Sequence, residues 1–172
     1  MHPSLAPLAS IYDLNTDLLL NCLEGLTDED ARARLPGGGN SIAFLAAHLA
    51  DTRHFLVGRL ERPLHNPLSS YLADARTIDD IHAWPPLRQI RDAWLAVADH
   101  LMSVLESLTA DALAREGVHR FPIGDSTSLG FLAFLAQHES YHVGQAGFVR
   151  RQLGRPAMTY ARDVREKSAL ME

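Results

Sequence analysis

Two histidines stand four residues apart in the run that covers residues 138–142, HESYH. In an α-helix this spacing places His138 and His142 on one face, about one turn apart, where both imidazoles can reach one metal ion. The run also matches the HExxH pattern, in which the glutamate, here Glu139, acts as a general base beside zinc. A five-residue pattern also occurs by chance, so two interior histidines with hydrogen-bond partners are the alternative interpretation.

His48 is a third candidate ligand, because it lies among small and apolar neighbours in residues 46–50, AAHLA. A single histidine in such a place is more often a core residue with a hydrogen-bond partner than a ligand. Three buried neutral histidines would need three separate partners, whereas one metal ion satisfies them together. Three protein ligands with an open position are typical of a catalytic metal site.

Other polar side chains share these helix faces. Asp51 follows His48 by three residues and could accept a hydrogen bond from a ligand imidazole, although a solvated carboxylate is the simpler interpretation. Glu139 is a candidate base if it faces the metal and not another helix. Tyr141 could line the pocket or pack in the core. Gln145 could bond a ligand imidazole, and a surface amide explains it equally well.

Four long helices must position these residues. Apolar residues recur at helical spacing, and Gly and Pro mark the breaks, which predicts long helices over residues 4–25, 40–62, 87–108 and 126–153. Short capped helices are predicted near residues 27–31 and 109–116. Residues 63–86 contain four prolines and form a long connection between the second and third long helices. The predicted fold class is therefore all-α, a four-helix bundle in one domain over residues 1–172.

The composition and net charge of the chain limit the kinds of partner and the cellular location that we expect for the protein. The chain has 172 residues and a formal net charge of −5, which argues against binding nucleic acid. Cys22 is the single cysteine, so no intrachain disulfide can form. No basic segment precedes an apolar run at the N-terminus, and no apolar stretch approaches the length of about 20 residues that a membrane helix needs. We expect a cytoplasmic protein without a membrane partner.

Three motifs give the chain a family resemblance. Residues 40–52, NSIAFLAAHLADT, and residues 138–145, HESYHVGQ, resemble the histidine motifs of the DinB-like (YfiT-like) superfamily of metalloenzymes. Residues 150–156, RRQLGRP, are similar to the tail that often follows them. The order of elements resembles the family over nearly the whole chain, although the two histidine motifs are the specific parts.

The resemblance implies a four-helix bundle that binds a divalent transition metal, zinc or nickel, through His48, His138 and His142. It also implies a homodimer. Relatives include thiol-dependent transferases and isomerases that use mycothiol or bacillithiol, and hydrolases. The leading hypothesis is therefore a metal-dependent enzyme acting on a small molecule, with a low-molecular-weight thiol as a candidate co-substrate. The alternatives are a metal-dependent hydrolase and a non-catalytic metal-binding stress-response protein.

Overall fold

The computed structural model describes residues 1–73, 75, 77–117 and 121–160, and these residues are all-α. The prediction of an all-α protein is therefore confirmed, since the described residues contain helices and no strand. The helices are α1 (Ala6–Leu23), α2 (Asp28–Arg32), α3 (Ile42–Arg59), α4 (Ser69–Leu72), α5 (Leu87–Ser107), α6 (Ala110–Ala114) and α7 (Ser128–Gln152), with 3-10 turns η1 (Pro3–Leu5) and η2 (Ile78–Asp80).

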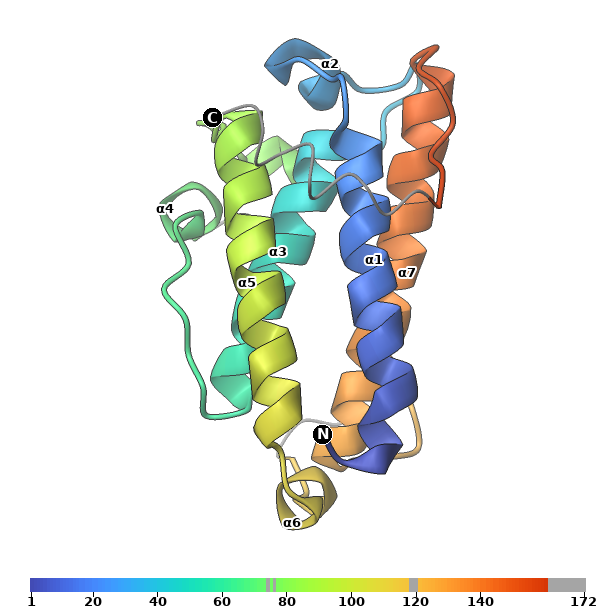
Figure 1. Cartoon of the computed structure of the whole chain (residues 1–172). Coiled ribbons are helices and arrows are strands. Elements are labelled where there is room, and N and C mark those ends of the chain that lie inside the picture. The colour runs from blue at the N-terminus through green and yellow to red at the C-terminus, as the bar shows by residue number, and fades with distance from the viewer. Residues whose placement is uncertain (74, 76, 118–120, 161–172) are drawn as a thin grey trace.

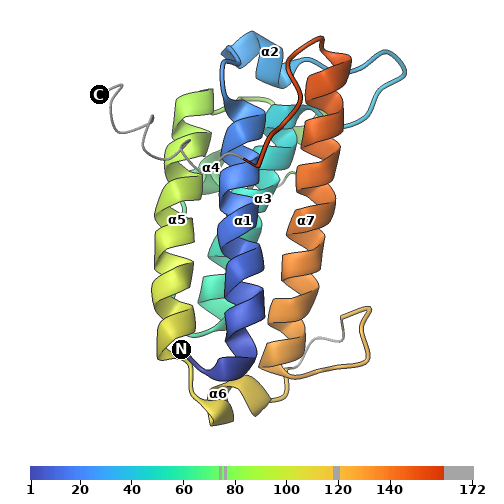
Figure 2. The ribbon, with the colours of Figure 1, turned by 45° about the vertical axis from the view of Figure 1, so that its right-hand side comes forward.

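The four long helices α1, α3, α5 and α7 lie side by side (Figures 1 and 2). Helix α1 packs against α5 and α7, and α3 packs against the same two helices from the other side. The short helices α2 and α6 lie at opposite ends of this assembly. The two helices that carry the candidate metal ligands, α3 and α7, are therefore direct neighbours.

Side-chain caps fix where the two ligand-bearing helices begin. Ser41 Oγ accepts a hydrogen bond from the backbone N–H of Phe44 at the start of α3. Thr127 Oγ1 accepts one from the backbone N–H of Gly130 at the start of α7. Such caps satisfy backbone donors that the first helical turn leaves unpaired. They fix the first residues of the two helices that carry the histidines.

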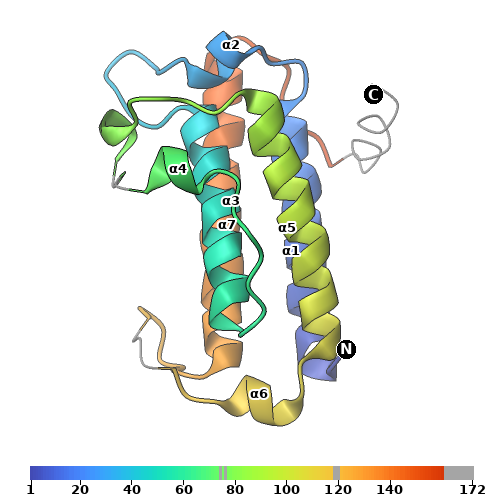
Figure 3. The same ribbon diagram turned by 90° about the vertical axis from the view of Figure 1, so that its left-hand side faces the viewer.

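Residues 60–86 connect α3 to α5 along the outside of α3 (Figure 3). The sequence predicts a helical turn near residues 77–83, and the structure has η2 at Ile78–Asp80. Helix α4 was not predicted, because four residues are too few for a periodic pattern. Asn66 holds the connection to α3, since its Nδ2 donates a hydrogen bond to Asp51 Oδ1 over 2.7 Å.

The core runs along the axis between the long helices. Each helix contributes leucines without solvent exposure, including Leu19, Leu49, Leu101 and Leu132. Burial of such apolar side chains is the main favourable term in folding. Among the described residues, no helix is both long enough and apolar enough to cross a membrane.

Candidate metal centre

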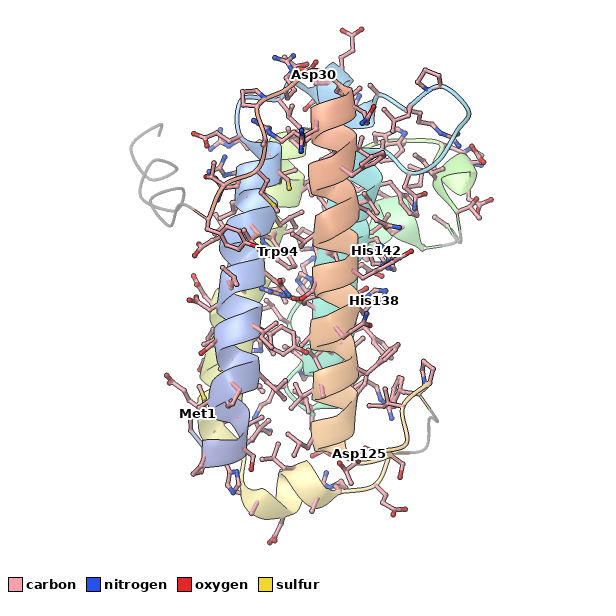
Figure 4. All side chains as sticks on the ribbon, turned by 90° about the vertical axis from the view of Figure 1, so that its right-hand side faces the viewer. Met1, Asp30, Trp94, Asp125, His138 and His142 are labelled. Atoms are coloured by element: carbon pink, nitrogen blue, oxygen red, sulfur yellow. The ribbon has the colours of Figure 1, made fainter. Side chains whose placement is uncertain are left out.

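Three imidazoles converge between α3 and α7. His138 Nε2 lies 3.4 Å from His48 Nε2 and 3.0 Å from His142 Nε2. Figure 4 shows His138 and His142 on the same side of α7, as their four-residue spacing predicts. One nitrogen from each of the three residues lies within 4.8 Å of the other two. His48, His138 and His142 could therefore hold one metal ion together.

The separations between these nitrogens fit ligands of a single ion. Imidazole nitrogens bind zinc at about 2.0–2.1 Å, so two nitrogens on one ion lie about 2.9–3.4 Å apart for bond angles between right-angled and tetrahedral. The two separations measured from His138 Nε2, 3.0 and 3.4 Å, fall within that interval. The donor set is also suitable, because imidazole binds zinc, nickel, copper and iron.

Gln145 fixes the orientation of one imidazole. Its Oε1 lies 2.7 Å from His142 Nδ1. An amide oxygen can only accept a hydrogen bond, so Nδ1 carries the proton and Nε2 presents its lone pair toward the other two histidines. A hydrogen bond to the far nitrogen is the usual way in which proteins orient a metal-binding histidine. Of the two interpretations of Gln145 that the sequence allows, this contact supports the hydrogen bond to a ligand imidazole.

Replacing Gln145 with leucine is expected to weaken metal binding roughly 10- to 100-fold, as loss of such an outer hydrogen bond typically does. Leucine keeps the volume of the side chain but removes the acceptor for His142 Nδ1. Competition with a chromophoric chelator measures the affinity. Gln145→Glu, which retains an acceptor, should bind metal nearly as well as wild type. Equal affinities for all three proteins would contradict an orienting role.

The local environment favours the neutral, metal-binding form of two of the imidazoles, those of His48 and His138. Burial, followed by the proximity of His142 and His138, lowers the pKa of His48 from 6.5 to about 4. Burial and the proximity of His142 also lower the pKa of His138. His138 Nδ1 is buried and has no hydrogen-bond partner among the described residues, so a positive charge there would be poorly solvated. At neutral pH, a metal ion therefore displaces no proton from His48 or His138.

The pKa of His48 makes the stability of the metal-free protein depend on pH. Its value in the folded state, about 4, lies below the ordinary 6.5, so the unfolded chain binds the extra proton between these values. The contribution to stability is complete above pH 6.5 and is lost as the pH falls through about 4. Urea denaturation in the presence of a chelator should show this loss in wild type and a smaller one in His48→Asn. Identical pH profiles would contradict the assignment.

Aromatic rings surround the three imidazoles on the surface of the protein. The ring of Tyr141 lies 5.1 Å from that of His142, and this tyrosine is 57% exposed. The rings of Phe44 and Phe134 lie 6.1 Å and 6.3 Å from those of His48 and His138. Each of the three histidines is only partly buried. An ion held here would therefore keep coordination positions on the solvent side.

The structure places Glu139 away from the three-histidine group. Both of its carboxylate oxygens accept hydrogen bonds from Arg53, over 2.7 and 2.9 Å, and each of these side chains is only 1% exposed. Its carboxylate is not among the ligand atoms that converge with the imidazoles. The catalytic role predicted for Glu139 stays a prediction, while its observed contacts are those of a buried ion pair.

Arg53 is the buried residue that sequence reasoning missed. Its Nη1 donates to Thr16 Oγ1 and its Nη2 to the Tyr12 carbonyl, each over 2.8 Å, and its guanidinium lies 3.7 Å from the ring centroid of Trp94. A signal in the sequence is the run of polar residues inside the first long helix, of which Asn15 and Thr16 are both buried. Through these hydrogen bonds of Arg53, Glu139, which directly follows His138, is connected to both α1 and α3.

The carboxylate of Asp51 contacts the connection between α3 and α5. Its carboxylate accepts the hydrogen bond from Asn66, and burial raises its pKa despite the opposing effects of His54 and of that hydrogen bond. Asp51 is not part of the converging ligand group. Its predicted role beside a ligand imidazole stays a prediction, while the observed contact anchors the connection between α3 and α5.

Comparison with known proteins agrees with the geometry. The sequence model of the DinB superfamily matches residues 11–146, a segment that includes His48, His138, His142 and Gln145. No curated protein matches the chain. Because the match spans most of the chain and contains the whole histidine group, the protein belongs to the DinB superfamily.

Proposed function

We propose that the protein is a divalent-metal-dependent enzyme that acts on a small molecule, with His48, His138 and His142 as its metal ligands. The observation that carries this proposal is the convergence of three imidazole nitrogens at a partly exposed position between α3 and α7. Three protein ligands on a surface-facing site leave coordination positions for a substrate, which favours a catalytic site over a closed structural one.

A thiol-dependent transfer is the reaction that we propose first. A bound zinc or nickel ion would supply Lewis acidity and lower the pKa of a coordinated thiol or water. The residues of the chain would hold and orient this site: Gln145 fixes the His142 ring, and Tyr141 lies beside it at the surface. A hydrolase would use the same ion, but Glu139, its predicted base, is engaged by Arg53.

The proposal includes a DinB-type four-helix bundle made of α1, α3, α5 and α7, and a homodimer. The exposed face of α7 around Tyr141, Gly144 and Phe148 supports the dimer. A Cβ atom at Gly144 would meet no described atom within 4 Å, so no helix among the described residues packs closely against this glycine. Sedimentation equilibrium would test the dimer, and a monomer at micromolar concentration would contradict it.

The proposed function is tested by measuring thiol consumption in the presence of a panel of electrophiles. The wild-type protein is compared after metal removal and after loading with zinc or nickel. We expect turnover only with the loaded protein, and none with His48→Ala. His82→Ala is the matched control, because His82 is an exposed histidine outside the site. Equal turnover by His48→Ala and wild type would contradict a metal-dependent mechanism at these residues.

A further inference from the structure

Four phenylalanines form a continuous set of ring contacts on one side of the candidate metal centre. Phe55 of α3 contacts Phe131 of α7, with ring centroids 6.1 Å apart. Phe121 stacks on Phe131 at 4.5 Å and on Phe134 at 5.4 Å. Phe134 in turn lies 6.3 Å from His138. We call Phe55, Phe121, Phe131 and Phe134 the aromatic flank.

The aromatic flank is not simply part of the core. Phe131 is 6% exposed and belongs to the core, but Phe55 is 49% exposed, and Phe121 and Phe134 are only partly buried. Contiguous exposed apolar surface of this kind marks a ligand site more often than isolated apolar residues do. Phe121 and Phe131 also line a surface cavity of about 330 Å³, which provides space beside the rings.

The spacing of residues along α7 places two members of the aromatic flank on the same helix face as the metal ligand His138. Phe134 and Phe131 precede His138 by four and seven residues, so all three lie on one face of α7. The flank therefore extends about 10 Å from the imidazoles at 1.5 Å per residue. The three imidazoles form side-chain hydrogen bonds and ring contacts with one another, with Gln145 and with nearby aromatic rings.

We propose that the aromatic flank binds an aromatic ring in the body of the substrate while the polar head of the same molecule binds the metal. This inference rests on the proposed metal-dependent function and adds the class of substrate. A small molecule with one metal-binding group and an aromatic ring one or two bonds away would place that ring against Phe134, the member of the flank nearest the imidazoles, whose ring centroid lies 6.3 Å from that of His138. Aromatic pairs in offset-stacked or edge-to-face geometry contribute beyond their buried area, so the flank would select such a ring over a polar group.

The test compares two thiols on the cobalt(II)-loaded protein, in which a bound thiolate produces a charge-transfer absorption band. Phenylmethanethiol carries the aromatic ring, and 2-mercaptoethanol lacks it. We expect wild type to bind phenylmethanethiol roughly tenfold more tightly, since burial of a ring is worth at least that factor. Phe134→Ala should reduce this preference by at least about twofold, and Phe134→Leu should reduce it as well, because leucine restores apolar volume but not the ring.

Two controls separate the aromatic flank from general effects. Phe134→Leu keeps an apolar side chain at this position, so it preserves the fold if Phe134→Ala does not. Tyr160→Ala removes an exposed aromatic ring on the segment that runs past α1, and should leave the preference unchanged. Cobalt binding with equal affinity for the two thiols, or with no thiol band, would overturn the inference about the flank alone. Absence of bound cobalt in wild type would overturn the metal-dependent function as well.

Discussion

Glu139→Gln is expected to lower the free energy of unfolding by roughly 3–5 kcal/mol, because it leaves the Arg53 guanidinium buried without its counter-charge. Glutamine keeps the shape of the side chain, so the change removes charge and little volume. Thr16 and the Tyr12 carbonyl still accept hydrogen bonds from Arg53, but neither carries a negative charge. Urea denaturation of wild type and variant, both metal-free, measures the difference.

Glu61→Gln is the matched control for this prediction. Glu61 pairs with Arg115 over 2.9 Å, but these side chains are 70% and 62% exposed, so solvent screens the interaction. Its loss should cost less than about 1 kcal/mol. The double variant Arg53→Met with Glu139→Leu should recover part of the lost stability, because it removes both buried charges. Similar effects of Glu139→Gln and Glu61→Gln would contradict the account of the buried pair.

His138→Ala is expected to abolish stoichiometric metal binding. His138 Nε2 is the atom that lies close to both other imidazoles, so its removal leaves two ligands from different helices. The affinity should fall by more than the roughly 100-fold that loss of an outer-shell partner can cause. Elemental mass spectrometry on protein prepared without a histidine tag measures the metal content, with about one equivalent expected in wild type.

Two comparisons show whether the effect belongs to the site. His82→Ala removes an exposed histidine and should retain the full metal content. Glu139→Gln, in the fraction that folds, should also retain it, since Glu139 is not among the converging ligand atoms. Loss of metal in either control to the same degree as in His138→Ala would indicate a general effect of misfolding.

The long helices that have clear boundary residues and a regular apolar stripe could be predicted from the sequence. The third long helix was predicted over residues 87–108 and is observed as Leu87–Ser107, because Pro86 precedes it and its apolar residues follow one stripe. The fourth was predicted to begin between residues 126 and 128, and Thr127 is its cap. The pairing of His138 with His142 follows from spacing alone. The addition of His48 followed from its small and apolar neighbours, and the resemblance to a family then supported it.

The interior polar network could not be predicted, because it depends on contacts between helices that are distant in sequence. An arginine in the middle of a helix is normally exposed, and nothing local distinguishes Arg53 from Arg59 on the same helix. Arg53 is buried because α1 supplies Thr16 and the Tyr12 carbonyl, while α7 supplies Glu139. The same contacts hold the Glu139 carboxylate in a buried ion pair.

The central claim is that one metal ion is bound by the Nε2 atoms of three histidines. X-ray absorption spectroscopy on the zinc- or nickel-loaded protein tests this most directly. We predict a first shell that includes three imidazole nitrogens, at about 2.0–2.1 Å for zinc. Scattering from the outer atoms of the rings should report three imidazoles in wild type and fewer in His142→Ala. A shell dominated by oxygen, or the same spectrum for both proteins, would contradict the claim.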